Sequence, residues 1–228
     1  MPRVSEPGPR DRILGAAEHA FAENGFEGAS LRDIVREAQV NLAMVYYYFQ
    51  SKNGLVEAVL KRRFGPLRGE HLDLLRDFER EAGSRPLLVE KILEAMLLPA
   101  LRLAAAEPAK RHAVTRLIGR VVTEPNPQIQ LILRSQRAEV QAAFLKAMQA
   151  ALPEISEPEL ERRIEFVWGA LSSILCNPQR LQLQTRGADK PWDAQTVMAE
   201  MIRFFAPGFR APGTSVRASA VPDYKAIS

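Results

Sequence analysis

Cysteine is almost absent from this 228-residue chain, which contains one cysteine, Cys176. A single cysteine excludes an intramolecular disulfide framework and is typical of proteins kept in a reducing cytosol. We interpret Cys176 as a small buried apolar residue rather than a redox sensor. Long uncharged apolar runs are also missing, and the Pro-rich, charged N-terminus has no apolar segment of the kind found in signal peptides. We therefore expect a cytoplasmic protein without a membrane partner.

Histidine is scarce as well, and its three copies (His19, His71 and His112) lie far apart in a spacing that suits no metal. We interpret each as a surface residue or as a buried residue with hydrogen-bond partners. The sequence has no glycine-rich phosphate loop and no nucleophile elbow. An enzyme is therefore not expected, nor is a cofactor or metal, although a helical enzyme remains an alternative to be tested with substrates.

Strand signals are missing too, because no run of alternating apolar and polar residues is bounded by turns. The apolar period is helical almost throughout, which predicts an all-α fold. Residues 1–9 and 207–228 are rich in Pro, Gly and Ser without an apolar period, and we expect both ends to be disordered. Between them we expect a small N-terminal domain (10–64) and a larger helical domain (65–206).

The N-terminal part carries signals for four short helices in about 55 residues. The first helix begins near Ile13 and should end at Asn24-Gly25, where glycine suits the left-handed conformation. Ser30, Asn41 and Ser51 are candidate N-caps for the next three. The second helix (31–38) and the third (42–48) are separated by about three residues. This is the spacing of a helix-turn-helix, in which the later helix enters the DNA major groove.

A run of aromatic residues, Tyr46-Tyr47-Tyr48-Phe49, ends the third helix and precedes Lys52. Three consecutive helical positions span roughly 200 degrees, so the tyrosines cannot all face the core. At least one hydroxyl must face outward. A phenol with a packed ring and an exposed hydroxyl is a rigid phosphate donor, and Lys52 adds charge beside it. Core packing of all three tyrosines is the alternative, and we favour phosphate binding.

The segment from Ile13 to Val59 resembles the DNA-binding domain of the tetracycline-repressor (TetR/AcrR) family. The resemblance rests on five runs taken together: 12–17 (RILGAA), 21–26 (FAENGF), 30–34 (SLRDI), 45–49 (VYYYF) and 51–52 (SK). It implies that 42–48 is the recognition helix, capped by Asn41. It further implies that bases are read by Arg32, Leu42, Ala43 and Met44, and that phosphates are held by Ser30, Tyr46, Tyr47 and Lys52.

Two positions depart from the family pattern. Gln39 stands in the turn where glycine is usual, so it must either adopt a positive φ at some cost or reshape the turn. Tyr48 stands where histidine is common. The domain is also barely basic, because residues 1–64 hold nine Lys/Arg and eight Asp/Glu, a net charge of +1. Affinity must then come from the placement of donors and from two copies binding together.

Prolines divide the remainder of the chain. We expect Pro66 and Pro86 to open helices, Pro99 to kink or divide a helix over 87–106, and further helices at 109–123, 127–151, 157–177 and 193–206. The helix 157–177 carries an apolar stripe: Ile164, Val167, Trp168, Leu171, Ile174 and Leu175. The stripe is either intramolecular core or, as the family resemblance implies for the pair 127–152 and 157–177, part of a four-helix homodimer interface, and we favour the dimer interface.

The region around Pro99 is the expected effector site. A kinked helix cannot pack flush along its length, and methionine is an adaptable pocket lining. We therefore predict a small-molecule cavity lined by Met96, Leu97, Leu101, Phe144 and Trp168 for an apolar or amphipathic ligand, such as an acyl or aromatic compound. The run 97–103 together with 118–120 and 124–125 faintly resembles a subgroup that includes fatty-acid-degradation regulators.

The resemblance implies a homodimeric repressor that leaves a palindromic double-stranded operator when its ligand favours a dimer with wrongly spaced recognition helices. A ligand can do this only to the extent that it binds the two states unequally. The alternative in another class is a helical adaptor that binds protein. Such an adaptor should show no salt-dependent DNA binding.

Overall fold

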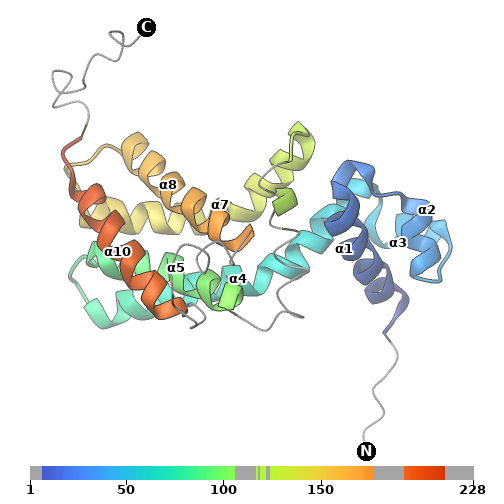
Figure 1. Ribbon diagram of the computed structural model, residues 1–228, viewed down its shortest axis with the longest axis horizontal. Helices are drawn as coiled ribbons and strands as arrows, with labels where there is room; N and C mark the ends of the chain where they lie inside the picture. The colour runs from blue at the N-terminus through green and yellow to red at the C-terminus, as the bar shows by residue number, and fades with distance from the viewer. Residues whose placement is uncertain (1–6, 106–116, 118, 122–123, 177–192, 214–228) are drawn as a thin grey trace, which may run out of the picture.

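Helices make up all the regular secondary structure in this computed structural model, which describes residues 7–105, 117, 119–121, 124–176 and 193–213 (Figure 1). The described part contains no strand, which confirms the predicted all-α class. The helices are α1 (Pro9–Gly28), α2 (Leu31–Glu37), α3 (Leu42–Phe49), α4 (Lys52–Ala82), α5 (Val89–Ala105), α7 (Pro127–Ala151), α8 (Glu157–Cys176) and α10 (Ala194–Arg210).

A compact N-terminal group of helices forms around one apolar core. Helix α1 breaks where the sequence predicts, because Gly25 has φ of 75°, and one further turn then ends at Gly28. The buried side chains include Phe21 and Phe26 from α1, Val45 from α3 and Leu55 from α4. Leu117, Ile129 and Leu133, which are distant in sequence, complete this core. The N-terminal group is therefore built partly from the C-terminal half of the chain.

Helix α4 links the two halves of the molecule (Figure 1). Our prediction that Pro66 opens a helix is wrong, because Pro66 lies inside the continuous α4. A proline in a helix interior removes one hydrogen bond and costs about 3 kcal/mol. Burial of α4 in both cores outweighs this cost, and Phe64 packs against both of them. Pro86 does not open a helix either, since α5 begins three residues later at Val89.

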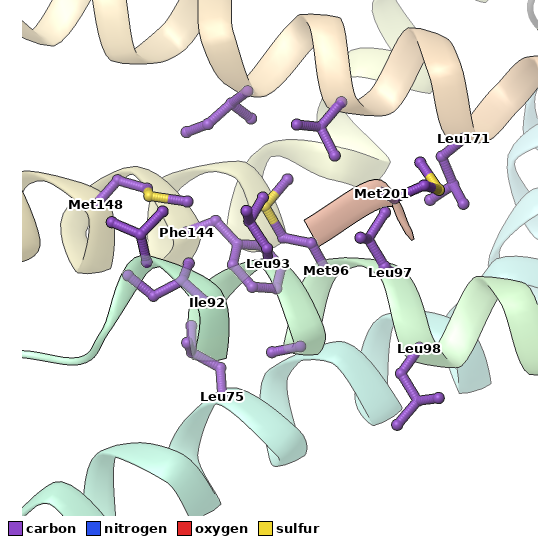
Figure 2. Close-up of a cluster of buried hydrophobic side chains, with 14 of the residues drawn as sticks. Leu75, Ile92, Leu93, Met96, Leu97, Leu98, Phe144, Met148, Leu171 and Met201 are labelled. Carbon is purple, nitrogen blue, oxygen red and sulfur yellow. The ribbon is translucent and has the colours of Figure 1, made fainter. Parts of the chain in front are cut away.

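The C-terminal core gathers side chains from α4, α5, α7, α8 and α10 (Figure 2). Helix α5 runs through Pro99 without division. On α8, Ile164, Val167, Leu171 and Leu175 are buried within the single chain. Our preference for a dimer interface is therefore wrong for these four residues, because they pack inside the single chain.

Helix α10 extends beyond the expected end of the ordered chain. Residues 207–210 are helical, so the prediction that disorder starts at 207 is wrong for them. Phe209 is buried in the core, and the Arg163 guanidinium donates to the carbonyl oxygens of Phe209 (2.5 Å) and Ala211 (2.8 Å). These contacts hold the helix end despite Pro207. The rest of the expected tail, 214–228, and residues 1–6 lie outside the described residues, as do most of the helix expected at 109–123 and His112.

Cys176 lies at the end of α8 and is exposed, so our interpretation of it as a buried residue is wrong. Burial still raises the pKa of the Cys176 thiol above its ordinary value. In the part of the chain that the structure describes, no helix is both long and apolar enough to cross a membrane.

Candidate DNA-binding interface

Helices α2 and α3 flank a tight turn at residues 38–41. Gln39 takes φ of 53°, so the turn keeps its shape with a left-handed residue that is not glycine. A backbone hydrogen bond from the Val40 N–H to the Val35 carbonyl (3.0 Å) closes the turn on the far side of Gln39. Arg12 of α1 supports the same turn by donating to the Ala38 carbonyl (3.1 Å). The helix-turn-helix is therefore braced by its neighbouring helix.

Two of the three predicted N-caps form. The Asn41 side chain accepts from the Met44 N–H (3.1 Å) at the start of α3, and the Ser51 hydroxyl accepts from the Gly54 N–H (3.0 Å) at the start of α4. Ser30 precedes α2 in extended backbone, but its side chain makes no capping bond, so that prediction is wrong. The half-buried Ser30 hydroxyl is not used in holding α2. Its predicted contact with phosphate stays a prediction.

Helix α3 has one side buried in the N-terminal core and the other side exposed to solvent. Val45 and Phe49 are packed in the N-terminal core, whereas Tyr46 is 50% exposed and Tyr47 is 78% exposed. The sequence prediction that at least one tyrosine faces outward is confirmed. The half-buried Tyr48 meets the Tyr47 ring edge-on, with centroids 4.9 Å apart, and so supports its position.

The predicted base-reading residues share the exposed surface with these tyrosines. Leu42 and Ala43 are exposed in the first turn of α3, Arg32 is exposed on α2, and Met44 is half-buried. Met44 also lines a shallow open hollow beside the turn, together with Pro9, Arg12, Val35, Arg36, Gln39, Val40 and Asn41. Arg36 is paired with Asp33 (2.6 Å) on its own helix. Leu42, Ala43, Tyr46 and Tyr47 are thus all exposed on α3, where Leu42 and Tyr46, and likewise Ala43 and Tyr47, lie one helical turn apart.

Lys52 opens α4 at the edge of this surface, and its surroundings could not be foreseen. Its ammonium donates to the backbone carbonyl of Glu27 at the end of α1 (2.7 Å). Partial burial lowers the pKa of Lys52 from its ordinary value, although the nearby Glu27 charge raises it. The Glu27 carboxylate accepts in turn from the Asn126 side chain. Sequence reasoning missed both residues, because no local pattern signals a contact across 99 positions.

The predicted effector residues are brought together, but they are closely packed. Met96, Leu97, Leu101 and Phe144 are fully buried, and Trp168 is half-buried. Figure 2 shows Met96 and Leu97 of α5 near Phe144 of α7 in the C-terminal core. The Phe144 and Trp168 rings meet edge-on, with centroids 6.3 Å apart. A ligand among these residues must displace packed side chains or shift a helix.

His71 of α4 lies in the same cluster. It is buried, and its ring nitrogens face two carbonyl oxygens: Nδ1 lies 2.7 Å from Leu67 O and Nε2 lies 3.0 Å from Met96 O. Burial lowers the pKa of His71 by more than the carbonyl contacts and the Glu70 charge raise it. A neutral imidazole carries one N–H, so it can donate to only one of the two carbonyls at a time. The interpretation of His71 as a buried residue with polar partners is confirmed.

A helix-turn-helix with an exposed recognition helix, mounted on a helical domain, defines a DNA-binding transcription regulator. Comparison with known families agrees. The model described as "Bacterial regulatory proteins, tetR family" matches residues 13–59, and the one described as "Tetracyclin repressor-like, C-terminal domain" matches residues 94–208. The chain belongs to the tetracycline-repressor family.

Individual relatives are similar over most of the chain. The HTH-type transcriptional regulator UidR of Escherichia coli K12 is 27% identical over 179 residues, which cover 72% of this chain and 90% of the relative. Among solved structures, Salmonella enterica GusR is 22% identical with a TM-score of 0.56 and covers 91% of this chain and 98% of its own. A candidate fatty acid metabolism regulator from Clostridium perfringens is 18% identical with a TM-score of 0.62, covering 86% and 97%. These structures support the fold.

Proposed function

We propose that the protein is a cytoplasmic homodimeric repressor that binds a palindromic operator through α3 of each subunit. The exposed face of α3 is the observation that carries this proposal. Its side chains Leu42, Ala43, Tyr46 and Tyr47 point to solvent while Val45 and Phe49 anchor the helix. Exposed apolar and aromatic groups on a capped, braced helix suit the major groove.

The predicted contacts divide into two kinds. Ser30, Tyr46, Tyr47 and Lys52 hold phosphates, and Arg32, Leu42, Ala43 and Met44 face base edges, with Asn41 fixing the start of the helix. Because the N-terminal region has a net charge of only +1 and only one of these four phosphate contacts is a cation, the electrostatic part of the affinity is small for one subunit. Two linked subunits then supply the affinity that one lacks.

The effector is an apolar or amphipathic small molecule bound among Met96, Leu97, Leu101, Phe144 and Trp168. This proposal is supported by the apolar character of the cluster and by its position between α4, α5, α7 and α8. Since these residues are closely packed without ligand, binding must shift helices, and the two states then differ in affinity for the ligand. Acyl and aromatic compounds that bind without releasing operator would contradict the proposal.

Selection of DNA from a random pool tests the function directly. A repressor of this kind should yield a palindrome with two half-sites about one helical turn, or a multiple, apart. Tyr46→Phe and Lys52→Gln should weaken binding to all sites alike. Lys52→Gln should also reduce the salt slope by about 1 per lost lysine–phosphate contact, whereas Tyr46→Phe removes a neutral donor and should leave the slope unchanged. Arg32→Ala and Met44→Ala should instead change base preference by about 1–3 kcal/mol at one position. Recovery of no sequence above background would contradict DNA binding.

A further inference from the structure

A short polar chain connects the C-terminal half of the molecule to Lys52. Asn126 is the N-cap of α7, and its side-chain oxygen accepts from the backbone N–H groups of Gln128 (2.8 Å) and Ile129 (3.3 Å). Its side-chain NH₂ donates to the Glu27 carboxylate. The Glu27 carbonyl accepts from the Lys52 ammonium (2.7 Å). Asn126 therefore binds the side chain of Glu27, and Lys52 binds its backbone carbonyl.

The position of the Glu27 carboxylate matters for DNA binding because it competes with phosphate. An ammonium has three donors, and the Glu27 carbonyl takes one of them, which leaves two for an operator oxygen. The carboxylate of the same residue already lies close enough to raise the pKa of the Lys52 ammonium. Without the bond to Asn126 it is free to approach further and form an ion pair. An exposed ion pair of this kind shifts an equilibrium by up to about fivefold.

The position of Asn126 depends on the packing of the C-terminal core, because Asn126 is the N-cap of helix α7. Helix α7 carries Ile129 and Leu133 in the N-terminal core and Phe144 and Met148 in the C-terminal core. Helix α7 is thus a single helix that packs into both the N-terminal and the C-terminal core. A shift of α7 moves Asn126 relative to α1, so the bond to Glu27 is sensitive to the packing around Phe144.

We propose that Asn126 is a positioning residue for DNA binding: by holding the Glu27 carboxylate, it keeps that carboxylate from neutralising Lys52. Lys52 then binds an operator phosphate more tightly while Asn126 is in contact with Glu27. The inference rests on the proposed phosphate contact of Lys52. It adds two residues outside the helix-turn-helix to those that set operator affinity.

Asn126→Ser tests the proposal, because serine keeps the N-cap of α7 but is too short to reach Glu27. The probe is the palindrome recovered by selection, and binding is measured by fluorescence anisotropy as a function of salt. Asn126→Ser should lower affinity about tenfold, since a dimer has two such contacts, and should lower the salt slope by about 2. The matched control is Gln128→Ala, which removes the Asn53–Gln128 bond (3.1 Å) across the same junction and should stay within about twofold of wild type.

A second substitution separates this role from a merely structural one. In the Glu27→Gln background no carboxylate remains to be held, so Asn126→Ser should have no further effect. Glu27→Gln alone should bind up to about threefold more tightly than wild type. An equal loss from Asn126→Ser in both backgrounds, or no loss in either, would overturn the proposal. Wild-type protein that selects no DNA would instead overturn the proposed function.

Discussion

At the scale of single residues, Gln39 is under backbone strain. Its φ of 53° lies in the left-handed region, which costs a residue with a side chain about 1 kcal/mol more than glycine. Gln39→Gly should therefore raise the free energy of unfolding by about 0.5–1 kcal/mol, measured by urea denaturation. Gln39→Val is the opposing variant and should lower it, because a β-branched side chain tolerates positive φ poorly. Destabilisation by glycine would contradict this account.

His71 should make stability depend on pH. Burial lowers its pKa in the folded chain below the ordinary value of 6.5, so the unfolded chain binds more protons as pH falls below that value. The neutral His71 therefore contributes its full share to the free energy of unfolding above pH 6.5. This contribution decreases as the pH falls towards the pKa of the folded chain. Wild type should lose up to about 1 kcal/mol more than His71→Gln between pH 7.5 and 5.5. Identical changes in urea-denaturation free energy for the two proteins would refute it.

At the scale of helices, α1 and α4 are joined by an ion pair between Glu18 and Arg63. The Glu18 side chain is only 6% exposed, whereas that of Arg63 is 37% exposed. Arg63→Met leaves a buried carboxylate without its partner and should cost about 2 kcal/mol, less than for a fully buried pair because water reaches Arg63. The double variant Glu18→Met/Arg63→Met should recover most of this loss.

The control for this prediction is Arg76→Met, which removes an exposed ion pair with Asp73 on α4 itself. It should change the free energy of unfolding by less than about 0.5 kcal/mol. Thermal or urea unfolding of all four proteins measures the differences. A similar loss from Arg63→Met and Arg76→Met would show that burial of Glu18 does not decide the effect.

Helix signals that act locally could be predicted from the sequence. The caps Asn41 and Ser51 bond to backbone three residues away, and the break at Gly25 needs only one permissive residue. Proline effects were misjudged because they depend on tertiary packing. Pro66 lies inside a helix whose half-buried Phe64 packs against both cores, and Pro207 lies between the buried residues Ala206 and Phe209.

Contacts between distant segments could not be predicted from the sequence. Eight of the nine predicted DNA contacts could be proposed together because they lie within one 18-residue stretch, 30–47, made of two consecutive short helices and the turn between them. By contrast, Glu27 and Asn126 meet only because α7 packs against the N-terminal core through Ile129 and Leu133. Periodicity identifies a buried side but not the helix that covers it.

At the scale of the whole molecule, we expect the proposed homodimer to form through the outward side of α8. The exposed residues Arg162, Phe166, Gly169, Ser173 and Cys176 follow one another at intervals of three and four, so they form one stripe opposite the buried side chains. Phe166 is 66% exposed, and the small residues after it permit close approach of a partner helix. This replaces the buried stripe as the candidate dimer surface on α8.

Phe166→Glu should therefore convert the proposed homodimer to monomer, because it places two carboxylates at a two-fold contact. Light scattering during size-exclusion chromatography measures the mass, and operator affinity should decrease by at least 100-fold, on the order expected when two linked contacts become one. Leu88→Glu is the matched control, since Leu88 is also 68% exposed but precedes α5 and belongs to neither α7 nor α8. A dimeric Phe166→Glu protein, or a monomeric Leu88→Glu protein, would place the interface elsewhere.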